Sequence, residues 1–119
     1  MRALLVPALA TMLSTAAQAE PVAAPPPAFA QCASCHSVMP GRHVFGPSLA
    51  GVSGRKAGSV EGYAYSEALR ASRLTWDAAT LERWLAGPQR LVPGTKMPFG
   101  GIPDPERRRA VVNYLMSLR

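Results

Sequence analysis

The chain of 119 residues has few of the residue types that build metal clusters or covalent cross-links. Its only cysteines are Cys32 and Cys35, and its only histidines are His36 and His43. A zinc finger needs further ligands. It also separates its cysteines from its histidines by many residues, whereas His36 directly follows Cys35. A disulfide between the two cysteines would close a very short loop and would stabilise the chain little. The composition therefore disfavours both a zinc site and a disulfide-stabilised scaffold.

Acidic residues are also scarce, since 7 Asp and Glu stand against 13 Lys and Arg, for a formal charge of +6. A basic surface favours acidic partners or an anionic membrane surface. No basic patch alternates with stacking aromatic side chains, and we interpret the arginine run at residues 107–109 as a solvated helix face. We therefore predict no nucleic-acid partner, and at most transient contact with a membrane surface.

Long apolar runs are absent beyond the first part of the chain. Residues 3–13 are almost entirely apolar, and Ala17-Gln18-Ala19 has the small-x-small pattern of a signal-peptidase site. We expect residues 1–19 to be a signal peptide cut after Ala19, which predicts a soluble, periplasmic mature protein. The alternative is an uncleaved membrane anchor, for which the apolar run is short.

The remainder is predicted to be all-α with long loops. Residues 20–27 are rich in proline and alanine and predict an extended tether. Residues 38–62 are rich in glycine without periodicity, which predicts a long loop wrapped around a large cofactor. Four helices are predicted. The first begins at Pro27 and runs through residues 32–36, and the second covers residues 66–72 with Ser66 as its N-cap. The third runs from Thr75 or Asp77 to Ala86 and stops at Gly87-Pro88, and the fourth follows the cap Asp104 and has an apolar face of Val111, Tyr114, Leu115 and Leu118.

Residues 32–36 read Cys-Ala-Ser-Cys-His, which matches the C-x-x-C-H signature of c-type haem attachment. On a helical turn the sulfurs of Cys32 and Cys35 project from one face and can add to the two vinyl groups of a porphyrin. His36 follows on that face, and its imidazole can reach the iron. The motif predicts one covalent haem c. A thiol–disulfide protein would use the same cysteines, but it usually sits in a βαβ context that is absent from this pattern.

The second iron ligand is predicted to be Met97. It lies in residues 91–101, a segment stiffened by prolines that can turn at its glycines. A thioether favours ferrous over ferric iron, so His/Met ligation raises the reduction potential. Met39 is too close to His36 in the chain, and Met116 lies off the apolar face of the last helix. The alternative is that Met97 only fills a gap in the core.

Three further segments follow the C-x-x-C-H motif in a fixed order: Phe-Gly-Pro-Ser-Leu-Ala-Gly at 45–51, Gly-Arg-Lys-Ala-Gly at 54–58, and Pro-Gly-Thr-Lys-Met at 93–97. With these motifs the chain resembles class I c-type cytochromes, on the branch of mitochondrial cytochrome c and cytochrome c2, over nearly all of residues 28–119. The resemblance implies the cytochrome c fold for residues 28–119, with about four short helices and long loops wrapped around one covalent haem.

The resemblance also implies roles for individual residues. His36 and Met97 would be the axial ligands, and the Pro47 carbonyl would accept the Nδ1–H of His36. Trp84 departs from the family, which commonly has a tyrosine beside the axial sulfur, and an indole N–H donates but does not accept. Leu69 replaces a polar residue, and the prolines at 25–27 shorten the first helix. The remaining implied contacts are Arg55, Tyr65 and Trp76 with the haem propionates, Thr95 beside the methionine, Phe99 at the exposed haem edge, Tyr114 on the first helix, and His43 with backbone.

The function implied is that of a monomeric, monohaem electron carrier, because two strong axial ligands leave no open position for a substrate. The carrier would shuttle electrons between periplasmic or membrane redox proteins with acidic docking surfaces: a cytochrome bc1-type donor and an oxidase or a reaction-centre-type acceptor. Lys96, Arg42, Arg90 and Lys56 would surround the haem edge and steer such partners. The alternatives are an electron-accepting subunit docked to a dehydrogenase or oxidase, and a peroxidase or gas-binding protein with an open sixth position.

Overall fold

The computed structural model describes residue 10, residues 12–17 and residues 23–119. The other residues of the expected signal peptide, including the cleavage position at Ala19, lie outside the described residues. Within the described part, no helix is long and apolar enough to cross a membrane.

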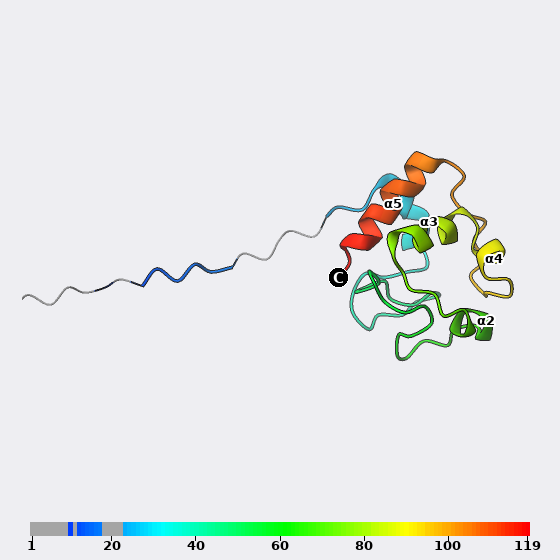
Figure 1. Ribbon diagram of the computed structural model, residues 1–119, viewed down its shortest axis with the longest axis horizontal. Coiled ribbons are helices and arrows are strands. Elements are labelled where there is room, and N and C mark those ends of the chain that lie inside the picture. Colours follow the sequence, from blue (N-terminus) through cyan, green and yellow to red (C-terminus); the bar gives the residue numbers. More distant parts are fainter. Residues whose placement is uncertain (1–9, 11, 18–22) are drawn as a thin grey trace, which may run out of the picture.

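Residues 27–119 form a helical domain in which the pairing of extended chain is limited to one isolated bridge between Lys56 and Thr75. The domain is shown in Figure 1. This arrangement confirms the all-α prediction. The elements are the 3-10 helix η1 (Pro27–Phe29) and the α-helices α1 (Ala30–Ala33), α2 (Glu67–Ala71), α3 (Ala78–Ala86), α4 (Pro88–Leu91) and α5 (Pro105–Ser117).

Three of the helices begin at the caps that the sequence indicates. The Ser66 hydroxyl accepts from the N–H of Leu69 at the start of α2. Asp77 caps α3 by accepting from the N–H of Thr80 at 2.7 Å. Asp104 caps α5 in the same manner, with proline in the first helical position. Each cap satisfies a backbone donor that has no partner inside its helix.

The first helix is shorter than predicted. Helix α1 ends at Ala33, and the N–H groups of Cys35 and His36 both bond to the Cys32 carbonyl, at 3.0 and 2.9 Å. The Cys35 carbonyl accepts from the N–H of Gly46 at 2.8 Å, so it is used by the following loop and not by a continuing helix.

Helix α4 was not predicted, because Gly87-Pro88 was interpreted only as a stop signal. Helix α3 does end at Ala86, but Pro88 also occupies the first position of a new helical turn. The Gly87 carbonyl starts this turn by accepting from the N–H groups of Arg90 and Leu91.

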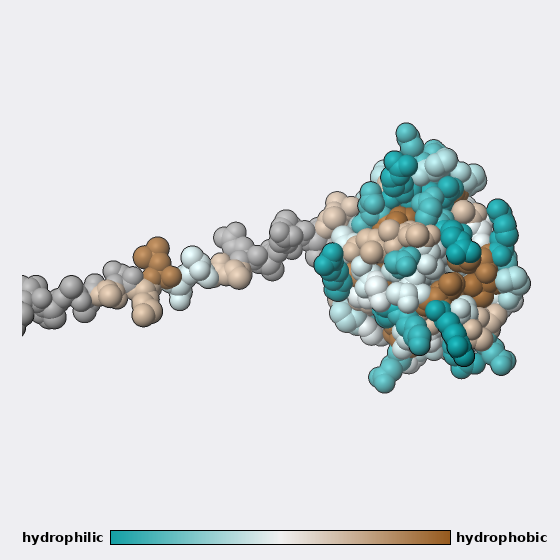
Figure 2. Space-filling view, in the orientation of Figure 1, coloured by the Kyte–Doolittle hydropathy of each residue, from teal (hydrophilic) through white to brown (hydrophobic). Residues whose placement is uncertain are grey.

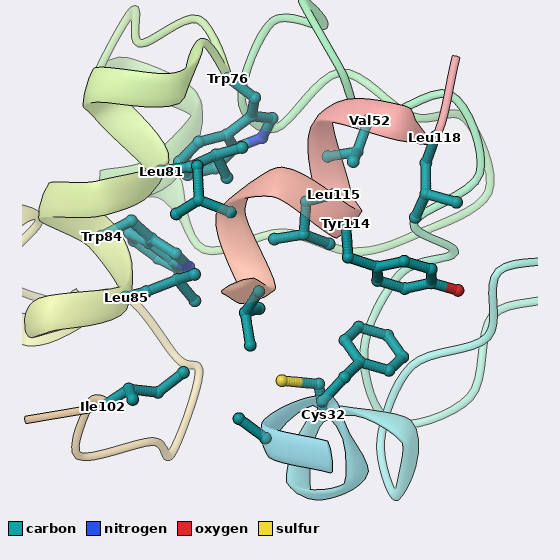
Figure 3. Close-up of a cluster of buried hydrophobic side chains, with 14 of the residues drawn as sticks. Cys32, Val52, Trp76, Leu81, Trp84, Leu85, Ile102, Tyr114, Leu115 and Leu118 are labelled. Carbon is teal, nitrogen blue, oxygen red and sulfur yellow. The ribbon is translucent and has the colours of Figure 1, made fainter. Parts of the chain in front are cut away.

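The core forms where η1 and α3 pack against α5. The Phe29 and Tyr114 rings meet edge to face, with centroids 4.8 Å apart, which confirms the predicted packing of Tyr114 on the first helical segment. Figure 3 shows Cys32 pointing from α1 toward the space between α3 and α5. Arg108 connects α5 to α3 and to the segment before α5, because it pairs with Glu82 of α3 and donates to the carbonyls of Ile102 and Pro103.

The predicted loop at residues 38–62 is confirmed, and backbone hydrogen bonds hold it to the segment before α3 and to the C-cap residue of α5. Gly54 donates to the Trp76 carbonyl at 2.9 Å, and Ser53 donates to the Leu118 carbonyl at 3.1 Å. His43 bonds to backbone as expected: its Nε2 donates to the Glu61 carbonyl, and its Nδ1 accepts from the N–H of Ser48.

Hydrophilic side chains project from the face shown in Figure 2 and surround a hydrophobic area. Large apolar side chains are also exposed on the loop that follows the C-x-x-C-H motif, among them Met39 and Phe45, which are 57% and 83% exposed.

Candidate haem-binding site

A largely apolar cavity of about 580 Å³ lies between the helices and the long loop. Ligand cavities in proteins typically range from about 300 to 1,000 Å³, so the space suits a large planar cofactor. All eleven site residues named from the sequence line it: Cys32, Cys35, His36, Pro47, Arg55, Tyr65, Trp76, Trp84, Thr95, Met97 and Phe99.

The C-x-x-C-H segment forms one wall of this cavity. Cys32 is buried, whereas Cys35 and His36 are partly exposed. Burial raises the pKa of the Cys32 thiol, and the neighbouring Cys35 thiol raises it further. The two sulfurs and the imidazole therefore line the same apolar space, which is the arrangement that thioether attachment and iron ligation need.

His36 is oriented by a backbone partner. Its Nδ1 lies 2.7 Å from the Pro47 carbonyl oxygen, which can accept only a hydrogen bond, so Nδ1 carries the proton and Nε2 is left with a lone pair. Burial lowers the pKa of the imidazole, against the opposing effect of the Pro47 carbonyl. The neutral ring is the form that binds a metal ion.

Gly46 lies against the His36 ring. A Cβ atom at this position would be 2.3 Å from Cε1 and 2.6 Å from Nδ1 of the imidazole. Glycine is therefore required for the close approach of the loop to the ring. The family resemblance assigned no role to Gly46, although this glycine lies in the Phe-Gly-Pro segment on which the resemblance depends.

Arg55, Tyr65 and Trp76 line another part of the cavity. The Arg55 guanidinium donates to the carbonyls of Ala50 and Ser48 at 2.7 and 3.2 Å, which fixes it in place. Burial lowers the pKa of Arg55 and raises the pKa of Tyr65. The charge interaction between the two groups opposes both shifts, because it raises the pKa of Arg55 and lowers that of Tyr65. The three side chains bring N–H and O–H donors into an apolar wall, as a buried carboxylate requires.

Trp84 packs edge to face against Trp76, with ring centroids 5.2 Å apart. Figure 3 shows both indoles beside Leu81 and Leu85. The tryptophan that departs from the family pattern thus extends the apolar wall of the cavity and is itself 7% exposed.

Met97 and Thr95 enter the cavity from the segment between α4 and α5. Lys96 lies between them; its ammonium group donates to the Ala64 carbonyl and sits 4.5 Å from the centroid of the Tyr63 ring. Of the four basic residues expected near the haem edge, Lys96 lines the cavity. Arg42, Lys56 and Arg90 are exposed.

The sequence analysis assigned no role to Phe45, Tyr63 or Gln89, although Phe45 opens the segment at 45–51. Phe45 and Tyr63 line the cavity, and the Tyr63 hydroxyl donates to the Phe45 carbonyl at 2.8 Å. The Gln89 amide donates to the carbonyls of Thr95 and Met97. These contacts depend on how the loops fold back, over 18 residues for Tyr63 and over six to eight for Gln89, so no local pattern reveals them.

Comparison with known proteins decides the family. The sequence model described as Cytochrome c matches residues 27–119. The chain belongs to the cytochrome c family. Cytochrome c2 iso-2 of Magnetospirillum fulvum is 50% identical over 93 residues, which cover 78% of this chain and 97% of that protein. Cytochrome c2 of Rhodoblastus acidophilus is 48% identical over 92 residues, covering 76% and 86% of the two chains.

A solved structure agrees with these relatives. Cytochrome cH from Methylobacterium extorquens superposes with a TM-score of 0.70 at 50% identity, and the match covers 74% of this chain and 89% of that one. Membership of the cytochrome c family makes the cofactor a covalent haem c, held through Cys32 and Cys35 of the C-x-x-C-H motif. It also makes the chain an electron carrier and not an enzyme.

Proposed function

We propose that this cytochrome is a soluble, periplasmic, single-electron carrier whose haem iron is ligated by His36 and Met97. The observation that supports this most strongly is that both side chains line one apolar cavity together with Cys32 and Cys35. A haem c bound there supplies a one-electron iron couple whose potential is raised by a thioether ligand.

The chain's own residues support the proposal on the histidine side. The Pro47 carbonyl holds the Nδ1 proton of His36 and so directs the Nε2 lone pair away from the loop. Gly46 packs against the ring and limits its movement. A ligand held this firmly keeps the same position in both oxidation states, which suits rapid electron exchange.

On the methionine side, Thr95 and Trp84 close the cavity around Met97 and are 5% and 7% exposed. We propose that Arg55, Tyr65 and Trp76 donate to the haem propionates and that Phe99 lies at the exposed haem edge. These walls exclude water from a carrier that has no substrate to admit.

Replacing the sulfur ligand tests the proposal. Met97→Ala is expected to remove the weak sulfur-to-iron band at the red end of the oxidised spectrum, to lower the midpoint potential, and to let the reduced protein bind carbon monoxide. Met39→Ala is the matched control, because Met39 is an exposed methionine close to the same motif. If reduced Met97→Ala does not bind carbon monoxide, another residue is the sixth ligand.

We further propose that residues 1–19 direct export and are removed, and that the partners present acidic docking surfaces. The relatives named cytochrome c2 and the basic composition support this proposal. The mass of the haem protein purified from cells should equal residues 20–119 plus haem. Electron transfer to an acidic redox protein should slow as salt is added; a rate independent of salt would argue against steering by charge.

A further inference from the structure

The segment that carries Met97 has little backbone support of its own. Among the residues that the structure describes, the backbone bonds of residues 95–99 are local: Thr95 donates to the Val92 carbonyl at 3.1 Å, and Phe99 donates to the Met97 carbonyl at 3.0 Å. Prolines at 93 and 98 have no N–H to contribute. Side chains from neighbouring elements must therefore hold the segment in place.

Gln89 supplies two such contacts. Its Nε2 donates to the Thr95 carbonyl at 2.6 Å and to the Met97 carbonyl at 3.2 Å. Both partners are carbonyl oxygens, so only the nitrogen end of the amide can satisfy them, and its two N–H groups match the two acceptors. The amide thus bridges the carbonyls of Thr95 and Met97, the residues on either side of Lys96.

The base of Gln89 is well anchored. It is the second residue of α4, directly after Pro88, whose side chain is fully buried. On the other side of the segment, Lys96 donates to the Ala64 carbonyl. The Met97 segment is therefore held between α4 and the residues before α2.

We propose that Gln89 is a positioning residue for Met97: its amide binds the two carbonyls that flank Lys96 and fixes where the Met97 sulfur lies in the cavity. The inference rests on the proposed ligation by Met97. Without the amide, both carbonyls lose a donor and the segment gains freedom, so the state in which the sulfur has left the iron is more populated. An external ligand that occupies the vacated position reports this population, because its apparent affinity scales with the open fraction.

The experiment titrates oxidised holoprotein with imidazole and follows the visible spectrum. Gln89→Met keeps the length of the side chain but has no donor, and we expect it to bind imidazole about tenfold tighter than the wild type, which corresponds to about 1.4 kcal/mol. Gln89→Arg retains several N–H donors and should bind imidazole less tightly than Gln89→Met. Arg83→Ala changes an exposed residue of α3 and should match the wild type.

Guanidinium unfolding of the same proteins separates positioning from general stability. Wild-type imidazole affinity in Gln89→Met would overturn the inference, whether or not its unfolding midpoint falls. Equal gains in Gln89→Met and Arg83→Ala would overturn it as well. A wild-type protein without the sulfur-to-iron band would instead refute Met97 ligation, so the two failures are distinguishable.

Discussion

Replacing Gly46 by alanine places a methyl group where the structure has the imidazole of His36. The new Cβ would lie 2.3 Å from Cε1 of the ring, whereas non-bonded carbon atoms prefer about 3.5–4.0 Å. The loop has little freedom to retreat, because the Gly46 N–H bonds to the Cys35 carbonyl at 2.8 Å and its carbonyl accepts from Val44 at 3.0 Å. The ring must therefore move by more than about 1 Å.

A shift of this size breaks the hydrogen bond between His36 and Pro47. Overpacking costs about 1–3 kcal/mol, and the lost hydrogen bond costs about 1 kcal/mol. We expect Gly46→Ala to lower the free energy of unfolding of the holoprotein by about 2–4 kcal/mol, which corresponds to a fall in Tm of about 10 °C or more.

The assay is thermal unfolding of purified holoprotein, together with haem staining after denaturing electrophoresis to measure covalent attachment. Gly100→Ala is the matched control, because a Cβ at Gly100 meets nothing within 4 Å. Wild-type Tm and full haem content in Gly46→Ala would refute the close approach of the loop to the imidazole.

Three further changes test other parts of the fold. Arg108→Ala should cost about 2–3 kcal/mol in urea unfolding, because it leaves the carbonyl of the buried Ile102 without its donor. Glu82→Ala should cost less than about 1 kcal/mol, because the Glu82 side chain is 40% exposed; equal costs would contradict this. Arg73 has a φ of 57°, so Arg73→Gly should stabilise the protein by about 1 kcal/mol in the same assay, and a loss of stability would contradict strain there. Hydrogen bonds from Thr80 hold the pKa of Asp77 below its ordinary value of 3.8, so the stability that this cap contributes is complete above that value and is lost as the pH falls through the lower native pKa. Asp77→Asn keeps the cap without titrating, so its urea midpoint should fall less than that of the wild type between about pH 6 and pH 3; identical falls would contradict the linkage.

Local signals predicted the helix starts well. Ser66, Asp77 and Asp104 each accept a hydrogen bond from a backbone N–H two or three residues later, so the cap and its partner lie within one short stretch of sequence. The end of α1 could not be predicted in this way, because the Cys35 carbonyl is taken by Gly46 from the following loop.

The same distinction applies to the candidate site. The C-x-x-C-H motif and the Pro-Gly-Thr-Lys-Met segment predict roles for Cys32, Cys35, His36 and Met97 because thiols, imidazoles and thioethers are the groups that attach a haem or bind its iron. Gln89 neither attaches a haem nor binds iron, and a glutamine on an exposed helix forms no sequence motif that would predict its contacts. Its contacts depend on how closely α4 approaches the Met97 segment, which is a property of the folded chain.

The cavity and the hydrophobic core are one structure in this protein. Nine buried side chains are both core residues and cavity lining: Phe29, Cys32, Val52, Leu69, Trp76, Leu81, Trp84, Leu85 and Leu115. These side chains pack against one another and also line the cavity, so a haem bound there would cover their remaining apolar surface and add to the burial that stabilises the fold. This explains how a loop without helix or strand over residues 38–62 stays ordered in a small domain. Its backbone N–H groups bond to the carbonyls of Trp76 and Leu118, and its apolar side chains line the cavity that a porphyrin would fill.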